Sequence, residues 1–278
     1  MNERNLGLIY PHNDRKDYKY ADDKYLAKSI LEKNGLPCPK TYAVVNSIGQ
    51  IEKSWNSVRH HRELVIKPAK GAGGKGIMIL TRSNDTWISQ GKVITDEEIF
   101  FHVANVIFGI YSFGDSDVAL IEEFIRPHKL FLKIYPNGVP DIRIILLKGV
   151  PLMAMLRMPT KESGGKANLH QGGLGIGVDM ESGKLLDAFD GQKYLNVHPD
   201  TGHSITGQTL PHWQELIVMS IEASKYFPLE YLGVDLVIDA EKGPMIMELN
   251  VRPGLAIQLA NRKGLKAVIT ENKKAFDQ

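Results

Sequence analysis

The sequence has a single cysteine, Cys38, among its 278 residues. One cysteine excludes an intrachain disulfide framework, and it excludes a metal site built on several thiolates. Cys38 stands between two prolines in the stretch LPCPK, a pattern typical of a turn rather than of a catalytic nucleophile. The fold must therefore be held together by its hydrophobic core.

An excess of one charge and long hydrophobic runs are also lacking. The formal net charge is +2 and basic clusters such as Arg262-Lys263 are short, so the composition does not favour a nucleic-acid partner. The most apolar stretch, residues 144–158, is interrupted by Lys148 and Pro151 and does not suit a membrane span. The N-terminal residues are too polar for a signal peptide. We therefore expect a cytoplasmic protein without a membrane span.

What is present is an ordinary globular composition, with 43% hydrophobic and 24% charged residues, on a chain that suits one large domain or two small ones. Hydrophobic spacing predicts helices over 22–34, 50–61, 96–110, 211–225, 255–264 and 265–275. It predicts strands over 41–45, 64–68, 77–80, 118–125, 131–135, 141–147, 151–158, 233–240 and 244–250. Residues 160–177, rich in Gly, Ser, Lys and Asn, indicate a functional or mobile loop. The sum is an α+β chain with antiparallel hairpins.

Residues 63–81, ELVIKPAKGAGGKGIMILT, contain a glycine-rich stretch that fits the pattern G-x-G-x-x-G. A P-loop would end in Gly-Lys-Ser/Thr, but Lys75 is followed by Gly76. A Rossmann loop would lead into a helix, but Gly76 leads into the strand-like IMIL. What remains is a β-hairpin whose glycine tip can approach phosphates closely, with Lys67 at the end of the first strand and Lys70 and Lys75 flanking the turn. The alternative is a flexible hairpin tip without a ligand.

Residues 233–254, GVDLVIDAEKGPMIMELNVRPG, predict a second hairpin, with its loop at 240–243. The register pairs Asp239 with Pro244, Val237 with Ile246, and Asp235 with Glu248. Because side chains alternate along a strand, Asn250 lies on the same face as Glu248. The opposite face, toward a core, receives Met245, Met247 and Leu249.

Two carboxylates directly opposite each other on a sheet repel, so a fold tolerates them where something offsets the repulsion. Asp235, Glu248 and Asn250 offer three oxygen donors, two of them anionic, which suits a hard cation such as Mg²⁺. The alternatives are a carboxylate that points into solvent, or a slipped register, although a one-residue slip would bury Glu248 and expose Met247. A phosphate-binding hairpin and a magnesium site together indicate a Mg–nucleotide enzyme.

At this point the motifs resemble the ATP-grasp superfamily, and within it the α-L-glutamate ligase-like (RimK-related) group. The order and spacing of the matching pieces make the resemblance specific, and the pieces run in order along nearly the whole chain. They are DDK (22–24), VIKPAKGAGGKGI (65–77), IEEFI (121–125), DIR (141–143), Arg157 with NLHQGG (168–173), GVDLVI (233–238) and MELNVRPG (247–254).

The resemblance implies an α+β ATP-grasp fold, in which two α+β subdomains clasp ATP between antiparallel sheets. It implies a short N-terminal segment (1–21), a subdomain with the glycine-rich loop (22–125) and a C-terminal subdomain with the metal site (126–278). Relatives carry a fuller domain before the DDK helix. We therefore expect a reduced N-terminal region here, and a homodimer or a partner chain that completes the substrate site.

The resemblance also implies an ATP site. Its lysines contact the phosphates, its glycine loop closes over them, and the backbone of residues 123–125 pairs with the adenine edge. The implied cofactor-binding residues are Lys24, Lys67, Gly71, Gly73, Gly74, Lys75, Gly76, Glu123, Phe124, Ile125 and His128. The implied ligands of Mg²⁺, for which Mn²⁺ is a substitute, are Asp235, Glu248 and Asn250.

Five further residues are implied in the chemistry: Arg143, Arg157, Arg252, Asn168 and His170. A guanidinium fork suits the transferring phosphate or a substrate carboxylate. Plainer roles stay open, namely a surface position for Lys24, rim ion pairs for the strand arginines and a loop hydrogen bond for His170. Position 252 carries a small hydroxyl residue in many peptide ligases of the superfamily, so Arg252 is a departure.

By the resemblance, the function is ATP-dependent carboxylate–amine ligation. A carboxylate attacks the γ-phosphate of ATP, giving an acyl phosphate and ADP, and an amine then displaces phosphate. The implied substrates are small molecules or peptides, with an amino acid such as L-glutamate among them. Two other functions stay open: a small-molecule kinase of ATP-grasp type and a nucleotide-binding regulatory module without chemistry.

Overall fold

The structure is a computed structural model that describes residues 3–71 and 73–276. The chain divides into two compact units. Unit 1 comprises residues 1–22, 26–38 and 126–278, and unit 2 comprises residues 23–25 and 39–125. The three domains expected from the resemblance stay a prediction, because compactness alone does not define a folding domain.

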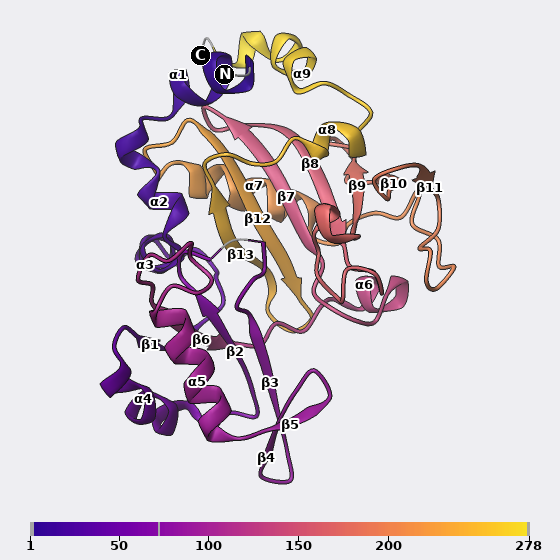
Figure 1. Ribbon diagram of the computed structural model, residues 1–278. Coiled ribbons are helices and arrows are strands. Elements are labelled where there is room, and N and C mark those ends of the chain that lie inside the picture. The colour runs from indigo at the N-terminus through magenta and orange to yellow at the C-terminus, as the bar shows by residue number, and fades with distance from the viewer. Residues whose placement is uncertain (1–2, 72, 277–278) are drawn as a thin grey trace. The chain divides into compact units, whose positions relative to one another are not determined.

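Unit 2 is built on a six-stranded antiparallel sheet with the strand order β1-β6-β2-β3-β4-β5 (Figure 1). In that order the strands are Thr41–Val45, Ala119–Glu123, Glu63–Pro68, Met78–Ser83, Thr86–Ser89 and Lys92–Ile94. Helices α4 (Ile51–Val58) and α5 (Asp96–Ile107) share one hydrophobic core with this sheet. Its fully buried members include Trp55, Leu64, Leu80 and Ile99.

Local sequence explains the start of α5. The Thr95 side chain accepts a hydrogen bond from Glu98 N, and the Glu98 side chain accepts one from Thr95 N, which together form a capping box. Three acidic residues occupy the first turn, where the helix dipole favours negative charge. The helix expected over 96–110 therefore begins where the pattern predicts and ends at Ile107.

The predicted glycine hairpin is confirmed, because β2 pairs with β3 from Glu63–Thr81 to Ile66–Met78. Strands β4 and β5 were not expected from the sequence. The two-residue turns Asn84-Asp85 and Gln90-Gly91, all at positive φ, connect β3, β4 and β5. Such turns match the twist of antiparallel strands, so these dipeptides are a signal that hydrophobic periodicity does not contain.

Unit 1 contains a seven-stranded antiparallel sheet with the order β11-β10-β9-β8-β7-β12-β13. In that order the strands are Tyr194–Leu195, Leu185–Phe189, Leu174–Val178, Val150–Met158, Asp141–Leu147, Tyr231–Asp239 and Gly243–Asn250. Two separate hydrophobic cores lie against this sheet. The alternation of side chains assigns Ile142, Ile144, Val234 and Leu236 to one core, and Ile145, Leu147 and Met153 to the other.

The helices of unit 1 divide between these two cores. Helices α6 (Lys129–Ile134) and α7 (Trp213–Ser224) contribute to the larger core, while α8 (Ala256–Ala260) and α9 (Leu265–Glu271) contribute to the smaller one (Figure 1). The smaller core also takes Leu8 and Ile9 of the first helical segment, and an ion pair joins Glu3 to Lys266 at 2.6 Å. The remaining helical segments are η1 (Asn5–Ile9), α1 (Tyr10–His12), η2 (Arg15–Asp17), α2 (Lys19–Asp22), α3 (Lys24–Lys33), η3 (Ile48–Gln50), η4 (Leu169–Gln171) and η5 (Lys273–Ala275).

The strand predicted over 131–135 is wrong, because this segment belongs to helix α6. The His128 side chain caps the helix by accepting a hydrogen bond from Leu130 N at 3.2 Å. Phe131 and Ile134, three residues apart, are both buried, which is helical spacing. In so short an apolar run the helical and strand periodicities cannot be told apart from the sequence. The His128 cap is what favours the helix.

The loop expected over 160–177 ends earlier than the composition suggests, because Leu174–Val178 forms strand β9. Two glycines in this strand gave the impression of a loop. A Cβ at Gly177 would lie 2.5 Å from the Ala260 carbonyl oxygen, so glycine is needed for the close approach of α8 to the sheet.

The register predicted for the β12–β13 hairpin is right at the carboxylates and wrong near the turn. Asp239 pairs with Gly243 and not with Pro244, because its carboxylate accepts hydrogen bonds from the amides of Glu241 and Lys242 and tightens the turn. A bulge at Met247 then restores the predicted pairing of Asp235 with Glu248. Met247, expected on the core face, is consequently only half-buried, whereas Met245 and Leu249 are buried.

Among the described residues, no helix combines the length and the apolar composition needed to cross a membrane. This agrees with the interruption of the apolar stretch by Lys148 and Pro151.

The core of unit 2 generates a first prediction. Trp55 is 1% exposed and its ring centroid lies 5.1 Å from that of Trp87. Trp55→Ala should lower the free energy of unfolding by about 3–5 kcal/mol, because it leaves a large cavity. Phe101→Ala, on the same unit but at a side chain that is 69% exposed, is the matched control and should change it by less than about 0.5 kcal/mol. Urea titration followed by circular dichroism measures both, and equal effects would contradict the assigned core.

Candidate functional site

A row of charged side chains crosses one face of the unit 1 sheet. Asp235 on β12 pairs with Glu248 on β13 and with Arg143 on β7. Two residues before Arg143, Asp141 pairs with Arg157 on β8. Residues directly opposite each other, and residues two apart on one strand, share a face. These five residues, which we call the charged row, therefore lie on a single face of four neighbouring strands.

Hydrogen bonds connect the charged row. Arg143 Nε and Nη2 donate to the two oxygens of Asp235 at 2.7 and 2.6 Å, which is a bidentate pair. Arg157 Nη2 donates to Asp235 Oδ2 at 2.5 Å, and Arg157 Nε donates to Asp141. Asp235 is thus held from two strands at once, and it is 1% exposed.

The row contains three carboxyl groups and two guanidinium groups, and burial acts on the carboxyl groups unequally. Although burial raises it, Arg143 and Arg157 hold the pKa of Asp235 well below its ordinary value. Burial, together with repulsion from Asp235, raises the pKa of Asp141 to about 7, although the attraction of Arg157 acts to lower it. Asp141 is therefore partly protonated near neutral pH, whereas Asp235 is the ionised carboxylate that the two arginines hold.

The donors beside Asp235 fit a magnesium ion. Mg²⁺ is typically bound through one or two carboxylates plus phosphate oxygens and water, and Glu248 and Asn250 supply a carboxylate and an amide oxygen on the same face. Gly233 pairs with Asn250 on the neighbouring strand. A Cβ at Gly233 would lie only 2.7 Å from Pro253 Cβ, so the space beside Asn250 requires glycine. Within residues 3–71 and 73–276, no group of three or more His, Cys, Asp or Glu side chains could hold a metal ion alone. A metal here would depend on Asn250 and on ligand oxygens.

In unit 2 the glycine-rich loop is bordered by lysines. Lys24 Nζ donates to the carbonyl oxygen of Gly71 at 2.6 Å, and Lys24 N donates to Ala69 O at 3.1 Å. Gly73, Gly74 and Gly76 all have positive φ, a conformation in which glycine costs least. The structure therefore brings Lys24, 47 residues away in sequence, to the start of the loop, while Lys75 is exposed at its tip. The expected contact of Lys24 with ATP phosphates stays a prediction.

Lys67, at the end of β2, forms an ion pair with Glu122 of β6 at 2.7 Å, and both side chains are buried. The next residue on β6, Glu123, accepts a hydrogen bond from Lys40 N at 2.7 Å through its side chain. Beyond Glu123 the chain leaves the strand, so Phe124 and Ile125 are not part of the sheet. An anionic ligand at Lys67 would compete with Glu122 for the same ammonium group.

Comparison with known proteins places the chain in a family. The model of the sugar-transfer associated ATP-grasp family matches residues 3–274. The chain is a member of this family. The predicted recognition of the ATP-grasp superfamily is thereby confirmed, and the two antiparallel sheets are those of an α+β ATP-grasp fold.

Curated relatives are more distant. Probable alpha-L-glutamate ligases from Legionella pneumophila (strain Corby) and Marinomonas sp. (strain MWYL1) are each 25% identical to this chain, over 267 and 272 residues. These alignments cover 95% and 96% of this chain, and 66% and 68% of the relatives. The ATP-grasp chain therefore spans about two thirds of the length of the curated relatives that it matches.

Solved structures support the fold. A D-alanine–D-alanine ligase from Bacillus anthracis in complex with ATP has a TM-score of 0.52 and 17% identity, covering 99% of this chain and 73% of that one. A RiPP-associated ATP-grasp ligase from Chryseobacterium gregarium, in complex with ADP and a leader and core peptide, has a TM-score of 0.52 and 14% identity, covering 96% and 64%. At these identities the likeness concerns the ATP-grasp fold alone.

The other expected site residues of the ATP-grasp chain lie in more varied surroundings. His128 caps α6, and its backbone donates to Ile238 O at 3.0 Å. Asn168 caps the short helix η4 by accepting a hydrogen bond from His170 N at 3.0 Å, and the His170 side chain is exposed. Arg252 is exposed, lies 3.5 Å from Asp22 and stacks over Tyr18 at 5.4 Å. None of these three contacts by itself assigns a role toward a ligand.

The expected site list omitted three charged residues that organise the candidate site. Asp141 belongs to the charged row, and its signal was the pattern Asp-Ile-Arg, which puts Asp141 and Arg143 on one face. Glu122 holds Lys67. Asp117 accepts hydrogen bonds from Lys70 N at 3.0 Å and from the Ser112 hydroxyl, which fixes the chain just before the glycine loop. Asp117 and Glu122 had no spacing signal, because their partners are distant in sequence.

The charged row generates a pH prediction. The pKa of Asp141 is 3.8 ordinarily and about 7 in the fold. A carboxyl group whose pKa is raised by folding stabilises the fold at low pH, and this stabilisation is lost as the pH rises toward 7. In EDTA, the free energy of unfolding should therefore fall between pH 5 and 7 more steeply in the wild type than in Asp141→Asn, by up to about 1.4 kcal/mol per pH unit.

Urea titrations at pH 5, 6, 7 and 8 measure this slope. Asp187→Asn is the control, because Asp187 pairs with Arg262 at the surface of the same unit and should keep the wild-type slope. Identical slopes for the wild type and Asp141→Asn would show that Asp141 stays ionised in the folded protein.

Proposed function

We propose that this ATP-grasp protein is an ATP-dependent carboxylate–amine ligase that works through an acyl phosphate. The observation that carries the proposal is the charged row, in which Asp235 and Glu248 face each other beside two arginines on one sheet of an ATP-grasp chain. Cations and metal-binding carboxylates gathered on one face suit the transfer of a phosphoryl group.

The proposed reaction has two steps. A carboxylate oxygen of the donor attacks the γ-phosphorus of ATP, the bond to the β-phosphate oxygen breaks, and ADP leaves. An amine then attacks the carbonyl carbon of the acyl phosphate, loses a proton, and expels inorganic phosphate. The products are an amide, ADP and phosphate.

Phosphoryl transfer requires positioning and neutralisation of charge more than covalent assistance. In unit 2, we assign Lys24 and Lys67 to the ATP phosphates, with the glycines of the loop allowing backbone amides to approach them. The expected roles of residues 123–125 at the adenine edge and of His128 at the ribose are part of the same proposal.

In unit 1, we assign Arg143 and Arg157 to the transferring phosphate or the donor carboxylate, since guanidinium groups bind such oxygens through paired hydrogen bonds. Asp235, Glu248 and Asn250 would hold Mg²⁺, or Mn²⁺ in its place, which neutralises charge on phosphate oxygens when it is bound. Asn168, His170 and Arg252 are assigned to the substrates. A homodimer or partner chain that completes the substrate site stays part of the proposal.

For the substrates, the relatives named as probable alpha-L-glutamate ligases favour an amino acid such as L-glutamate as the first donor to test. The family description associates these proteins with sugar transfer, which makes amino sugars the first amine acceptors to test, before peptides. An ATP-grasp kinase is the second candidate and would release a stable phosphate ester. A nucleotide-binding regulatory module would release no ADP with any substrate.

Nucleotide turnover in the presence of hydroxylamine tests the reaction type. The protein is incubated with ATP, Mg²⁺ and one amino acid at a time, and ADP, AMP and trapped hydroxamate are assayed. ADP together with a hydroxamate is expected for the ligase, because hydroxylamine intercepts an acyl phosphate. ADP with a phosphorylated product and no hydroxamate would favour the kinase, and AMP would exclude both.

Two variants test the assigned residues. Lys67→Ala and Glu248→Gln should each lower ATP turnover by at least about 100-fold, because each removes charge that stabilises the transferring phosphate. Cys38→Ala is the control and should retain wild-type turnover, since Cys38 is a partly buried thiol 4.0 Å from Glu32. Full activity in Glu248→Gln would remove the metal assignment.

A further inference from the structure

The connection between β8 and β9 leaves and re-enters the sheet beside the charged row. Arg157 lies one residue before the end of β8, and its partner on β9 is Gly175. The intervening residues 159–173, which we call the β8–β9 loop, contain Asn168 and His170. The two ends of the loop are thus set by the strand that carries Arg157 and by the strand paired with it.

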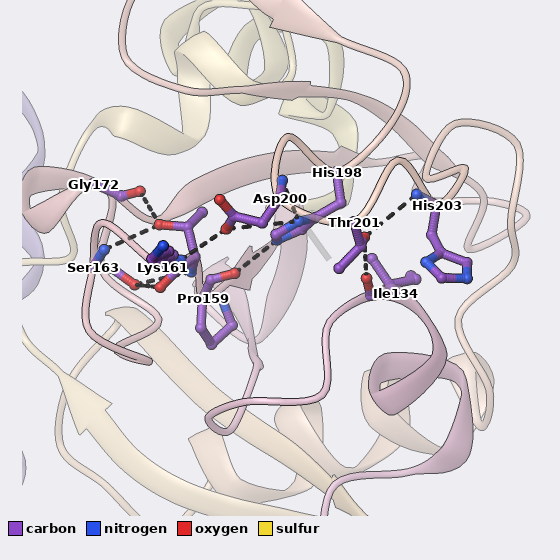
Figure 2. A network of polar contacts seen from close by, with 10 residues as sticks. Ile134, Pro159, Lys161, Ser163, Gly172, His198, Asp200, Thr201 and His203 are labelled. Carbon is purple, nitrogen blue, oxygen red and sulfur yellow. Dashed lines mark hydrogen bonds and ion pairs between the residues drawn. The ribbon is translucent and has the colours of Figure 1, made fainter. Parts of the chain in front are cut away.

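Hydrogen bonds close the base of the β8–β9 loop. The Thr160 hydroxyl donates to Gly172 O at 2.7 Å, which ties the first residues of the loop to the last (Figure 2). Thr160 N donates to the Ser163 hydroxyl at 2.9 Å, and Ser163 N donates to Thr160 Oγ1 at 3.0 Å. Both residues are buried. Hydrogen bonds within the chain therefore hold the base of the loop together.

A second segment, distant in sequence, holds this base in place. Residues 197–204 form a tight turn in which Val197 bridges to Ser204 and His198 N donates to His203 O at 2.8 Å. The imidazole of His198 is 0% exposed and stacks on Tyr135, with the ring centroids 4.6 Å apart. The Thr201 hydroxyl donates to Ile134 O at 2.7 Å, which joins the turn to the end of α6 (Figure 2).

His198 links the turn to the loop through both of its ring nitrogens. His198 Nε2 lies 2.9 Å from Pro159 O, which can only accept, and Nδ1 lies 3.3 Å from Asp200 N, which can only donate. These partners assign the neutral imidazole with its proton on Nε2. The Asp200 carboxylate in turn accepts a hydrogen bond from Lys161 N at 2.8 Å. The turn therefore grips the backbone of the loop at residues 159 and 161 (Figure 2).

Hydrogen bonds rather than apolar contacts hold the β8–β9 loop against the turn, because the loop has little apolar surface to bury. Its sequence, PTKESGGKANLHQGG, includes four glycines and only three aliphatic or proline residues, namely Pro159, Ala167 and Leu169. Glycine-rich backbone loses much conformational freedom on ordering. A leucine at position 198 would fill the volume of the imidazole but would leave Pro159 O and Asp200 N without their partners.

We propose that His198 is a positioning residue, which with Asp200 holds the β8–β9 loop in place so that Asn168 and His170 are presented to the substrates before they bind. The role of Asn168 and His170 rests on the proposed function. The contacts of His198 with Pro159 O and of Asp200 with Lys161 N, which we call the clamp, are independent of it. The His198 imidazole acts through the loop backbone and contacts no substrate.

Limited trypsin digestion tests the clamp without any reference to catalysis. Lys166 is exposed in the β8–β9 loop, and Lys193 is exposed in the turn between β10 and β11 and serves as an internal control. In His198→Leu and in Asp200→Ala, cleavage after Lys166 should be on the order of tenfold faster than in the wild type, since each variant removes a hydrogen bond that closes the loop. Cleavage after Lys193 should be unchanged.

His198→Gln supplies the conservative variant, because a glutamine amide can donate to Pro159 O as Nε2 does. It should restore cleavage at Lys166 to within about threefold of the wild-type rate. Asp200→Ala alters a side chain that is 28% exposed, so it keeps the test valid if His198→Leu does not fold. Equal cleavage at Lys166 in the wild type and Asp200→Ala would overturn the clamp, and so would parallel acceleration at Lys193.

Steady-state ADP release tests the role toward substrates. The clamp variants should raise the KM for the donor by on the order of tenfold and leave the KM for ATP unchanged, with His198→Gln near the wild type. An equal rise in both constants would overturn the positioning role. If the wild type releases no ADP, the proposed function fails, and faster cleavage at Lys166 in Asp200→Ala would still support the clamp.

Discussion

The carboxylate of Asp235 is the centre on which unit 1 is organised. It sits on the third of four neighbouring strands and receives guanidinium groups from β7 and β8 while facing Glu248 on β13. Such a buried anion is stable only when cations and hydrogen bonds replace the water that it lost. The three strands must therefore keep their register, because a slip of one residue would turn the arginines to the opposite face.

The need to keep this register accounts for several local features of the sheet. The tight turn made by the Asp239 carboxylate shifts the β12–β13 pairing by one residue, and the bulge at Met247 shifts it back at Asp235. The glycines of β9 allow α8 to approach the sheet closely, next to the strand that carries Arg157. Around the charged row, both faces of the sheet are otherwise filled by aliphatic side chains.

In unit 2 the main constraint is the placement of lysine side chains beside the glycine-rich loop. The ammonium groups of Lys24 and Lys67 each contact an acceptor, Gly71 O and the Glu122 carboxylate respectively. Asp117 fixes Lys70 N just before the loop. Positive groups near glycines at positive φ form an anion-binding concavity in principle, and here acceptors within the chain contact those positive groups. In unit 1, hydrogen bonds hold the β8–β9 loop in a similar way. The His198 imidazole donates to Pro159 O, and the Asp200 carboxylate accepts from Lys161 N.

Several of these features could be predicted from the sequence. The Asp235–Glu248 pairing was predicted correctly, although the expected turn is one residue too long and the bulge at Met247 compensates for the difference. The glycine hairpin follows from strand-like residues on both sides of residues 71–76. Prediction failed where a local side-chain contact decides the structure. The His128 cap turned an expected strand into α6, and the Asn84-Asp85 and Gln90-Gly91 turns added two strands that periodicity does not reveal.

The sequence by itself therefore determined the strands of the two predicted hairpins, the order of the ATP-grasp motifs and the pairing of residues close along the chain, because these depend on local geometry. The tertiary structure alone decided that Asp141 and Arg157 join Asp235, that Glu122 pairs with Lys67, and that His198 grips the chain at residue 159. In each of these cases the partners come from different strands or loops. Their meeting depends on the order of strands in a sheet and on the burial of charge, neither of which any short stretch of sequence contains.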